Sequence, residues 1–164
     1  AEINAITSRN LELLKNQREK TIYGSLLWVL DECKTSMGTR LLKRFINNPL
    51  LNIEKIRKRQ EDVQYFIDNI LIREDLREKL EDIYDLERLL GKIIFGSENG
   101  KDLTALKKTI KSAVEIMRIL GNTDFFKNID ANILFECYKI IDDSINEDAP
   151  FSVREGGIIK SGYN

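Results

Sequence analysis

The sequence predicts an all-α fold: a multi-helical bundle with one short strand near the N-terminus and a small extended or hairpin segment at the C-terminus. Only two prolines occur in 164 residues, Pro49 and Pro150. The segments between turn signals are rich in Leu, Glu, Lys and Arg, which are strong helix formers. Apolar residues in these segments recur at spacings of three and four. We expect one helical domain over residues 1–150 and an extended segment over residues 151–164.

The first elements are short. The alternation Leu11-Glu12-Leu13 lacks a helical stripe and predicts a strand within residues 9–15. Residues 26–30, Leu-Leu-Trp-Val-Leu, are apolar all round, which predicts a short helix that is buried on most sides and ends near Asp31. Trp28 is therefore expected in the core.

Two amphipathic helices are expected next. Thr35 or Ser36 can cap the first by accepting a backbone N–H bond, and Asn47-Asn48-Pro49 stops it. Asn52 is the expected N-cap of the second. Their apolar stripes are Met37, Leu41, Leu42, Phe45 and Ile46, and then Ile53, Ile56, Val63, Phe66, Ile67 and Ile70.

The helical pattern continues from Ile72 to Leu90, with one break near Asp82, and Gly96 is a helix-ending residue. Asp102 is expected to cap a long helix that Gly121-Asn122 terminates. The two buried stripes are Leu76, Leu80, Ile83, Leu86, Leu89 and Leu90, and then Leu103, Leu106, Ile110, Ala113, Val114, Met117 and Leu120.

The last expected helix covers Ala131 to Ile145, after a turn at Phe125-Phe126, and Pro150 closes the helical region. Glycines around Ile158-Ile159 predict the hairpin or extended tail. The inward residues of this helix are expected to be Ile133, Leu134, Cys137, Ile140 and Ile141.

Composition excludes several classes of function. Lys and Arg total 26 against 27 for Asp and Glu, so the net charge of −1 gives no general attraction to nucleic acid. Histidine is absent, which removes Ser-His-Asp triads and His-ligated zinc. Cys33 and Cys137 are too few for a disulfide scaffold and are interpreted as buried thiols of a cytoplasmic protein. No apolar stretch can span a bilayer, and residues 1–4 carry neither a signal peptide nor a Met, which suggests a piece of a longer chain.

Charge is nevertheless uneven along the chain. Residues 34–60 hold eight cations and one anion, whereas residues 61–90 hold ten anions and four cations. We favour a solvated basic face that pairs with the acidic stretch over a nucleic-acid surface, since only Phe45 is interleaved with the cations. The cations are Lys34, Arg40, Lys43, Arg44, Lys55, Arg57, Lys58 and Arg59.

Other candidates support no catalytic, cofactor-binding or metal-binding residue. Residues 96–101, Gly-Ser-Glu-Asn-Gly-Lys, resemble a phosphate loop but follow a helix and are one residue too short, so we expect a turn between helices. Gly91 lies inside a helical pattern, where it either allows the close approach of another helix or is accidental. The Arg88 side chain is expected to reach water. Met37 is expected in the core. Without histidine, the acids Glu74, Asp75, Glu78, Glu81, Asp82, Asp85 and Glu87 cannot complete a helical di-iron site.

Four stretches resemble the DNA mismatch repair MutS family in its central core, or lever, domain. Thr7–Leu13 resembles the entry into that domain. Leu30–Leu42, followed by Pro49-Leu50, is similar to its L-D-x-x-x-T-x-M-G-x-R-L-L…P-L signature. Residues 85–92 and 101–106 are similar to its D-L-E-R-L…D-L-x-x-L region. Arg154–Asn164 resembles the segment before the helix that leads to the DNA clamp.

The resemblance implies a role in a larger homodimeric protein that recognises mismatched duplex DNA and uses ATP with Mg. These residues would couple the ATPase domain to the clamp mechanically. The family's mismatch-reading motif, P-loop and clamp have no counterpart in the sequence, so no site residue carries over, and no membrane or small-molecule substrate is implied. The alternatives are a free-standing helical domain that binds protein or nucleic acid through Lys34–Arg59, and a carboxylate-based enzyme.

Overall fold

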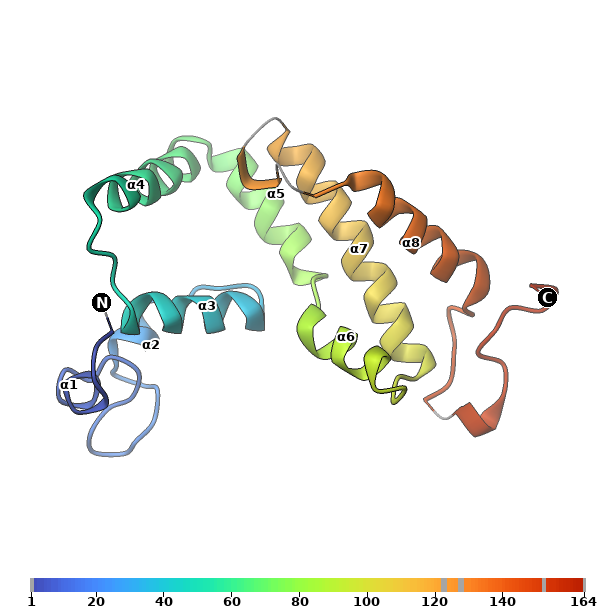
Figure 1. The fold of residues 1–164 in the computed structure, drawn as a ribbon, viewed down its shortest axis with the longest axis horizontal. Coiled ribbons are helices and arrows are strands. Elements are labelled where there is room, and N and C mark those ends of the chain that lie inside the picture. Colours follow the sequence, from blue (N-terminus) through green and yellow to red (C-terminus); the bar gives the residue numbers. More distant parts are fainter. Residues whose placement is uncertain (1, 122–123, 127–128, 152, 164) are drawn as a thin grey trace. The chain divides into compact units, whose positions relative to one another are not determined.

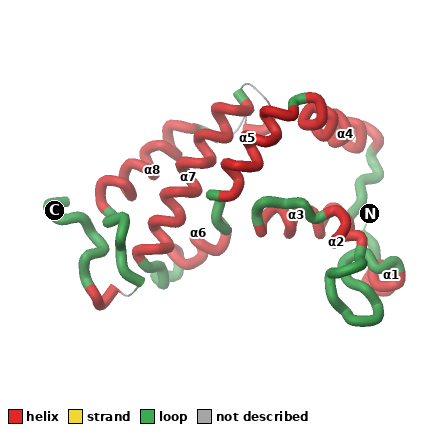
Figure 2. The backbone as a smooth tube through the Cα atoms, turned by 180° about the vertical axis from the view of Figure 1, so that it is seen from behind, coloured by secondary structure: helices red, strands yellow, loops and turns green. Residues whose placement is uncertain are grey.

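The computed structural model describes residues 2–121, 124–126, 129–151 and 153–163. The chain divides into two compact units, residues 1–70 and residues 71–164, called unit 1 and unit 2 below. Throughout the described residues the regular elements are helices, with one isolated antiparallel bridge between Ile145 and Ile159 (Figure 2). The all-α prediction is confirmed. The division into 1–150 and 151–164 stays a prediction.

Unit 1 begins with a helix rather than the predicted strand. The side chain of Asn4 accepts a hydrogen bond from the Thr7 N–H and starts α1 (Ala5–Asn10). The chain then turns at Glu12, whose φ is 49°. This turn, not a strand alternation, carries Leu13 to a buried position. The strand prediction for residues 9–15 is therefore wrong, because the N-cap and the turn override the alternation.

The second helix, α2 (Leu26–Leu30), begins where Ser25 Oγ accepts a hydrogen bond from the Trp28 N–H and ends at Asp31, as predicted. Its expected burial on most sides is wrong. Within this helix only Leu27 is buried, and Trp28 is 51 % exposed. A single short helix offers one side to its neighbours, so the Trp28 ring lies against Tyr23 at 4.8 Å between centroids and stays half in solvent.

The next two helices begin where the sequence predicts. Thr35 caps α3 (Ser36–Asn47) by accepting from the Gly38 N–H at 3.0 Å, and Asn52 caps α4 (Ile53–Asp68) by accepting from the Lys55 N–H at 2.9 Å. The stop at Asn47-Asn48-Pro49 is confirmed. Within the described chain, no residue of α3 or α4 is buried. Their apolar stripes are therefore only partly covered.

Unit 2 is built on one long helix, α7 (Gly100–Leu120). Before it come α5 (Ile70–Glu81) and α6 (Leu86–Ile94), and the gap between them confirms the break near Asp82. Gly96, with φ 62°, follows the end of α6 as predicted. The 3-10 turn Asp124–Phe126 leads to α8 (Ala131–Ser144), and α6 and α8 lie against α7 (Figure 1).

The inward face of α8 differs from the prediction. Leu134, Tyr138 and Ile141 pack against the core of Leu89, Leu106 and Ile110. Two interleaved apolar series run along this helix at spacings of three and four, and only one of them can face α7. Leu134 and Ile141 were predicted correctly, whereas the members of the other series are exposed: Ile133, Cys137 and Ile140.

The cysteine and tail predictions have different outcomes. Both cysteines are exposed, so the expectation of two buried thiols is wrong. The described part of the tail has a 3-10 turn at Val153–Glu155, two glycines with positive φ at Gly156 and Gly157, and a turn at residues 161–162, so it is extended only around Ile159. The Asn146 N–H donates to the Ile158 carbonyl and the Lys160 N–H donates to the Ser144 carbonyl, each at 2.8 Å. This single bridge holds the tail beside the end of α8.

Candidate functional site: the long helix and its cross-links

The start and end of α7 are fixed by local chemistry. Asn99, not Asp102, is its N-cap. The Asn99 side chain accepts from the Asp102 N–H at 3.0 Å, and the Asp102 carboxylate accepts from the Asn99 N–H at 3.1 Å. Asp102 is thus the third residue of the helix, where it completes a capping box, and α7 begins about one turn earlier than predicted. Gly121 ends the helix with φ 54°, as predicted, and Asn122 lies outside the described residues.

The buried stripe of α7 is only partly the predicted one. Leu106, Ile110 and Leu120 are buried, and the other predicted members are half-buried. The pattern missed Ile116, which is buried on the same helix together with Thr109 and Ser112. Helices therefore cover α7 on more than one side, which a single periodic stripe does not indicate.

Polar contacts join α7 to its neighbours along its length. Lys92 Nζ of α6 donates to the Asp102 carboxylate at 2.7 Å. The Tyr84 N–H, between α5 and α6, donates to Thr109 Oγ at 3.0 Å. At the far end, Lys79 Nζ of α5 lies 3.1 Å from Glu115. Three separate segments are thus tied to one helix.

Lys107 ties α7 to α8 and the residues after it. Its ammonium donates to Asp142 at 3.0 Å and lies 3.5 Å from Glu147. Burial lowers the pKa of Lys107, but the hydrogen bond and negative charge of Asp142, helped by Glu147, outweigh it and leave the pKa above 10.5. The hydrogen bond to Glu115, together with its charge, also raises the pKa of Lys79. Both side chains stay charged and paired near neutral pH.

Close approach of the backbone occurs at Gly100, which the sequence did not single out. A Cβ built there would lie 2.5 Å from the Ala149 Cβ and 3.3 Å from the Pro150 carbonyl oxygen. Only glycine lets the segment after α8 lie against the start of α7. Gly91 has open space around it, so of its two interpretations the close approach of another helix is wrong and an accidental glycine remains.

The remaining candidates fall into ordinary positions. Residues 96–99 connect α6 to α7, and Gly100 and Lys101 already belong to α7, so the predicted turn between helices is confirmed. Arg88 is exposed, as expected, and Met37 is half-buried on α3. Among the described residues, no group of three or more Cys, Asp or Glu side chains is placed to hold a metal ion. Among the acids of residues 74–87, Glu74 pairs with Arg73 and Glu78 with Lys79. Asp85 accepts from the Arg88 N–H at the start of α6.

The basic segment is spread over α3 and α4. Arg59 stacks on the Phe45 ring at 3.7 Å from its centroid, and Lys58 pairs with Asp62 one turn away at 3.0 Å. Lys55 and Arg57 are exposed on α4. The Lys58–Asp62 pair thus joins the basic segment to the start of the acidic stretch within α4.

Unit 2 is thus a set of helices that an apolar core and ion pairs hold around the central helix α7. This arrangement places the chain in the class of helical structural domains. In the part of the chain that the structure describes, no helix has the length and apolarity needed to cross a membrane.

Comparison with known proteins identifies the family. The family model for MutS domain III matches residues 6–161. A DNA mismatch repair protein MutS from Fusobacterium nucleatum is 51 % identical over 99 % of this chain, and those from Bacillus velezensis and Bacillus subtilis are 42 % and 41 % identical over the same share. The chain spans 18–20 % of the length of these relatives. The chain belongs to the MutS domain III family, as its motifs indicated.

Proposed function

We propose that this chain is the helical core of a DNA mismatch repair protein and couples an ATPase domain mechanically to a DNA clamp. Its residues perform no chemistry. The observation that carries the proposal is the attachment of α5, α6 and α8 to α7 by ion pairs or hydrogen bonds, with apolar packing of α6 and α8 against the same helix. A helix of 21 residues is roughly 30 Å long. Such a body can transmit displacement over that distance without bending.

Other parts of the longer protein would supply the remaining functions. Mismatched duplex DNA, ATP and Mg would bind there, and the protein would act as a homodimer in the cytoplasm. The names of the relatives support the repair role. Coupling between two such sites is typically worth about 1–3 kcal/mol, and a network of contacts that has two arrangements can carry it.

The proposal is tested in the full-length protein with Thr109→Val. This change removes the acceptor of the Tyr84 N–H and so loosens the α5–α6 turn from α7. We expect ATP-dependent release from mismatched DNA to slow about fivefold or more, which corresponds to about 1 kcal/mol of coupling. ATP hydrolysis without DNA and mismatch affinity without nucleotide should be unchanged.

Thr104→Val is the matched control. Thr104 Oγ donates to the Gly100 carbonyl within α7, so this variant loses a hydroxyl without cutting a cross-link. Equal release rates in the two variants would contradict mechanical coupling through these contacts.

A second candidate function is binding of nucleic acid or protein through Lys34–Arg59. It is favoured by the exposure of Lys55 and Arg57 on a helix that buries none of its residues in the described chain. Binding of duplex DNA by this chain should then weaken steeply with salt, because phosphate contacts release counterions. Lys55→Gln with Arg57→Gln should reduce the salt slope by about two, and absence of binding at low salt would exclude this function.

A further inference from the structure

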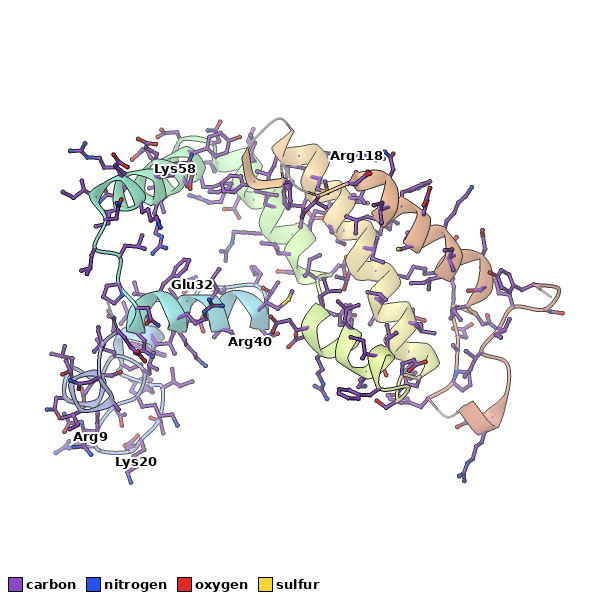
Figure 3. All side chains as sticks on the ribbon, viewed as in Figure 1. Arg9, Lys20, Glu32, Arg40, Lys58 and Arg118 are labelled. Carbon is purple, nitrogen blue, oxygen red and sulfur yellow. The ribbon has the colours of Figure 1, made fainter. Side chains whose placement is uncertain are left out.

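Unit 1 contains a cavity of about 760 Å³ among α1, the segment after it and the C-terminal end of α3. Three cationic side chains line it: Arg9, Lys15 and Lys20. Glu2 is the one carboxylate among its lining residues, and Ile3 and Leu14 provide apolar surface. Figure 3 shows the side chains of Arg9 and Lys20 in this part of the chain.

The walls of the cavity are joined by hydrogen bonds between segments far apart in sequence. The Ile3 N–H donates to the Asn47 carbonyl at 2.8 Å. Ser8 Oγ donates to the Asn47 side-chain oxygen at 3.1 Å. These bonds hold the start of the chain and α1 against the end of α3. The hollow is therefore part of the fold of unit 1 and not a gap between loose segments.

The segment that carries Lys15 and Lys20 is held by its own polar groups. Glu12 accepts from the Gln17 N–H at 2.7 Å, and Asn16 donates from its side chain to the Tyr23 carbonyl at 2.8 Å. The backbone of Lys20 has a φ of 54°. This left-handed conformation is unfavourable for any residue other than glycine and persists only where the surrounding structure enforces it. A surface loop fixed in this way is pre-organised to present its cations.

The three cations differ from the lysines that link α7 to its neighbours in unit 2. Lys79, Lys92 and Lys107 each lie within 3.1 Å of a carboxylate oxygen. Across the residues that the structure describes, Arg9, Lys15 and Lys20 form no ion pair. Three cations that share one hollow repel one another, and an anion bound there would relieve that repulsion.

We propose that this cavity binds a small phosphorylated organic molecule. Arg and Lys together suit phosphate: Arg as a two-pronged donor and Lys as a compact charge. The volume lies within the 300–1,000 Å³ typical of small-molecule sites, and an apolar wall with a few polar groups is the usual lining. A hollow bounded by three separate segments suits a compact ligand better than an extended acidic chain. The inference is independent of the mechanical role proposed above.

The test is calorimetric titration of this chain with adenosine 5′-monophosphate at low salt, with adenosine as the uncharged comparison. We expect saturable binding of the phosphorylated compound and at least tenfold weaker binding of adenosine. Lys15→Gln with Lys20→Gln should weaken binding at least tenfold. The matched control is Lys111→Gln with Lys139→Gln, which removes the same charge from exposed positions in unit 2 and should change affinity less than twofold.

Several results would overturn the proposal. The first is the absence of saturable binding below about 5 mM, a concentration at which even a weak metabolite site would be occupied. The second is equal affinity for adenosine, and the third is equal weakening of binding in the Lys111→Gln, Lys139→Gln variant. Circular dichroism shows whether each variant is folded. Because these side chains are exposed or half-exposed, their replacement should leave the helical signal unchanged.

Discussion

The two units bury their side chains to very different degrees. Unit 1 buries two large apolar residues among its described positions, Leu13 and Leu27, and is held mainly by caps and loop hydrogen bonds. Unit 2 buries residues on α5, α6 and α7 and in the segment after α8. Both units have apolar stripes of similar quality in sequence. The difference shows that a stripe becomes a core only where a long helix offers its neighbours a continuous surface.

The two units also differ in how their charged side chains are paired. In unit 2 three lysines, Lys79, Lys92 and Lys107, pair with carboxylates on neighbouring segments, so their charge contributes to the fold. In unit 1 three cations line one cavity and form no ion pair among the described residues. Paired charges therefore link helices in unit 2, whereas the three cations of unit 1 are available to bind an anion.

Leu106→Ala should show how far the stability of unit 2 depends on its apolar core. Leu106 is 8 % exposed and lies at the centre of the core of unit 2. Its truncation should lower the free energy of unfolding of unit 2 by about 2–5 kcal/mol, through lost burial and the cavity that remains. Urea unfolding followed by circular dichroism measures this, and the fluorescence of Trp28, the single tryptophan, reports on unit 1.

Leu41→Ala is the control for this prediction. Leu41 is 43 % exposed on α3, so its truncation should cost less than about 1 kcal/mol. The fluorescence transition should not move in Leu106→Ala if unit 1 unfolds on its own. Similar losses in the two variants would show that the difference in burial has no energetic counterpart.

A pair of glycine substitutions separates packing from helix propensity. Gly100→Ala forces a Cβ against Ala149 and should destabilise unit 2 by about 1–3 kcal/mol, after partial offset by the better helix propensity of alanine. Gly91→Ala meets no atom within 4 Å and should stabilise α6 by about 0.5–1 kcal/mol. Thermal unfolding distinguishes them by sign, and a shift of both in the same direction would contradict the close approach at Gly100.

Local signals in the sequence were sufficient to predict where most helices begin and end. Thr35 and Asn52 cap α3 and α4 as expected, and Gly96 and Gly121 follow helix ends. These outcomes depend on a few neighbouring residues, so the sequence contains the information. The family motifs carried the rest of the assignment.

Choices between equivalent surfaces could not be predicted in the same way. The two apolar series of α8 have the same spacing, and only the position of α7 decides that Tyr138 packs while Ile140 stays exposed. The contact that requires Gly100 joins residues almost fifty positions apart. The cavity of unit 1 likewise depends on Asn47 meeting Ile3 and Ser8. Each is a tertiary contact, which residue periodicity does not encode.

The stability of unit 2 should also depend weakly on pH, through the paired charge of Lys107. The pKa of Lys107 is raised in the folded chain because Asp142 and Glu147 together outweigh the cost of burial. The stabilising contribution of a raised pKa is fully present below the unfolded value of 10.5 and is lost as pH rises through the folded value. Unfolding of unit 2 should therefore become easier above pH 10.5.

Lys107→Met keeps the length and helix propensity of the side chain and removes its proton equilibrium, so this variant should lose less stability than the unmodified chain as pH rises above 10.5. Lys139→Met, on the exposed side of α8, controls for the loss of one positive charge. Urea midpoints measured in steps from pH 9 upward give the slopes. If Lys107→Met and the unmodified chain show the same slope, the ion pair with Asp142 does not link protonation to folding, and apolar packing alone fastens α8 to α7.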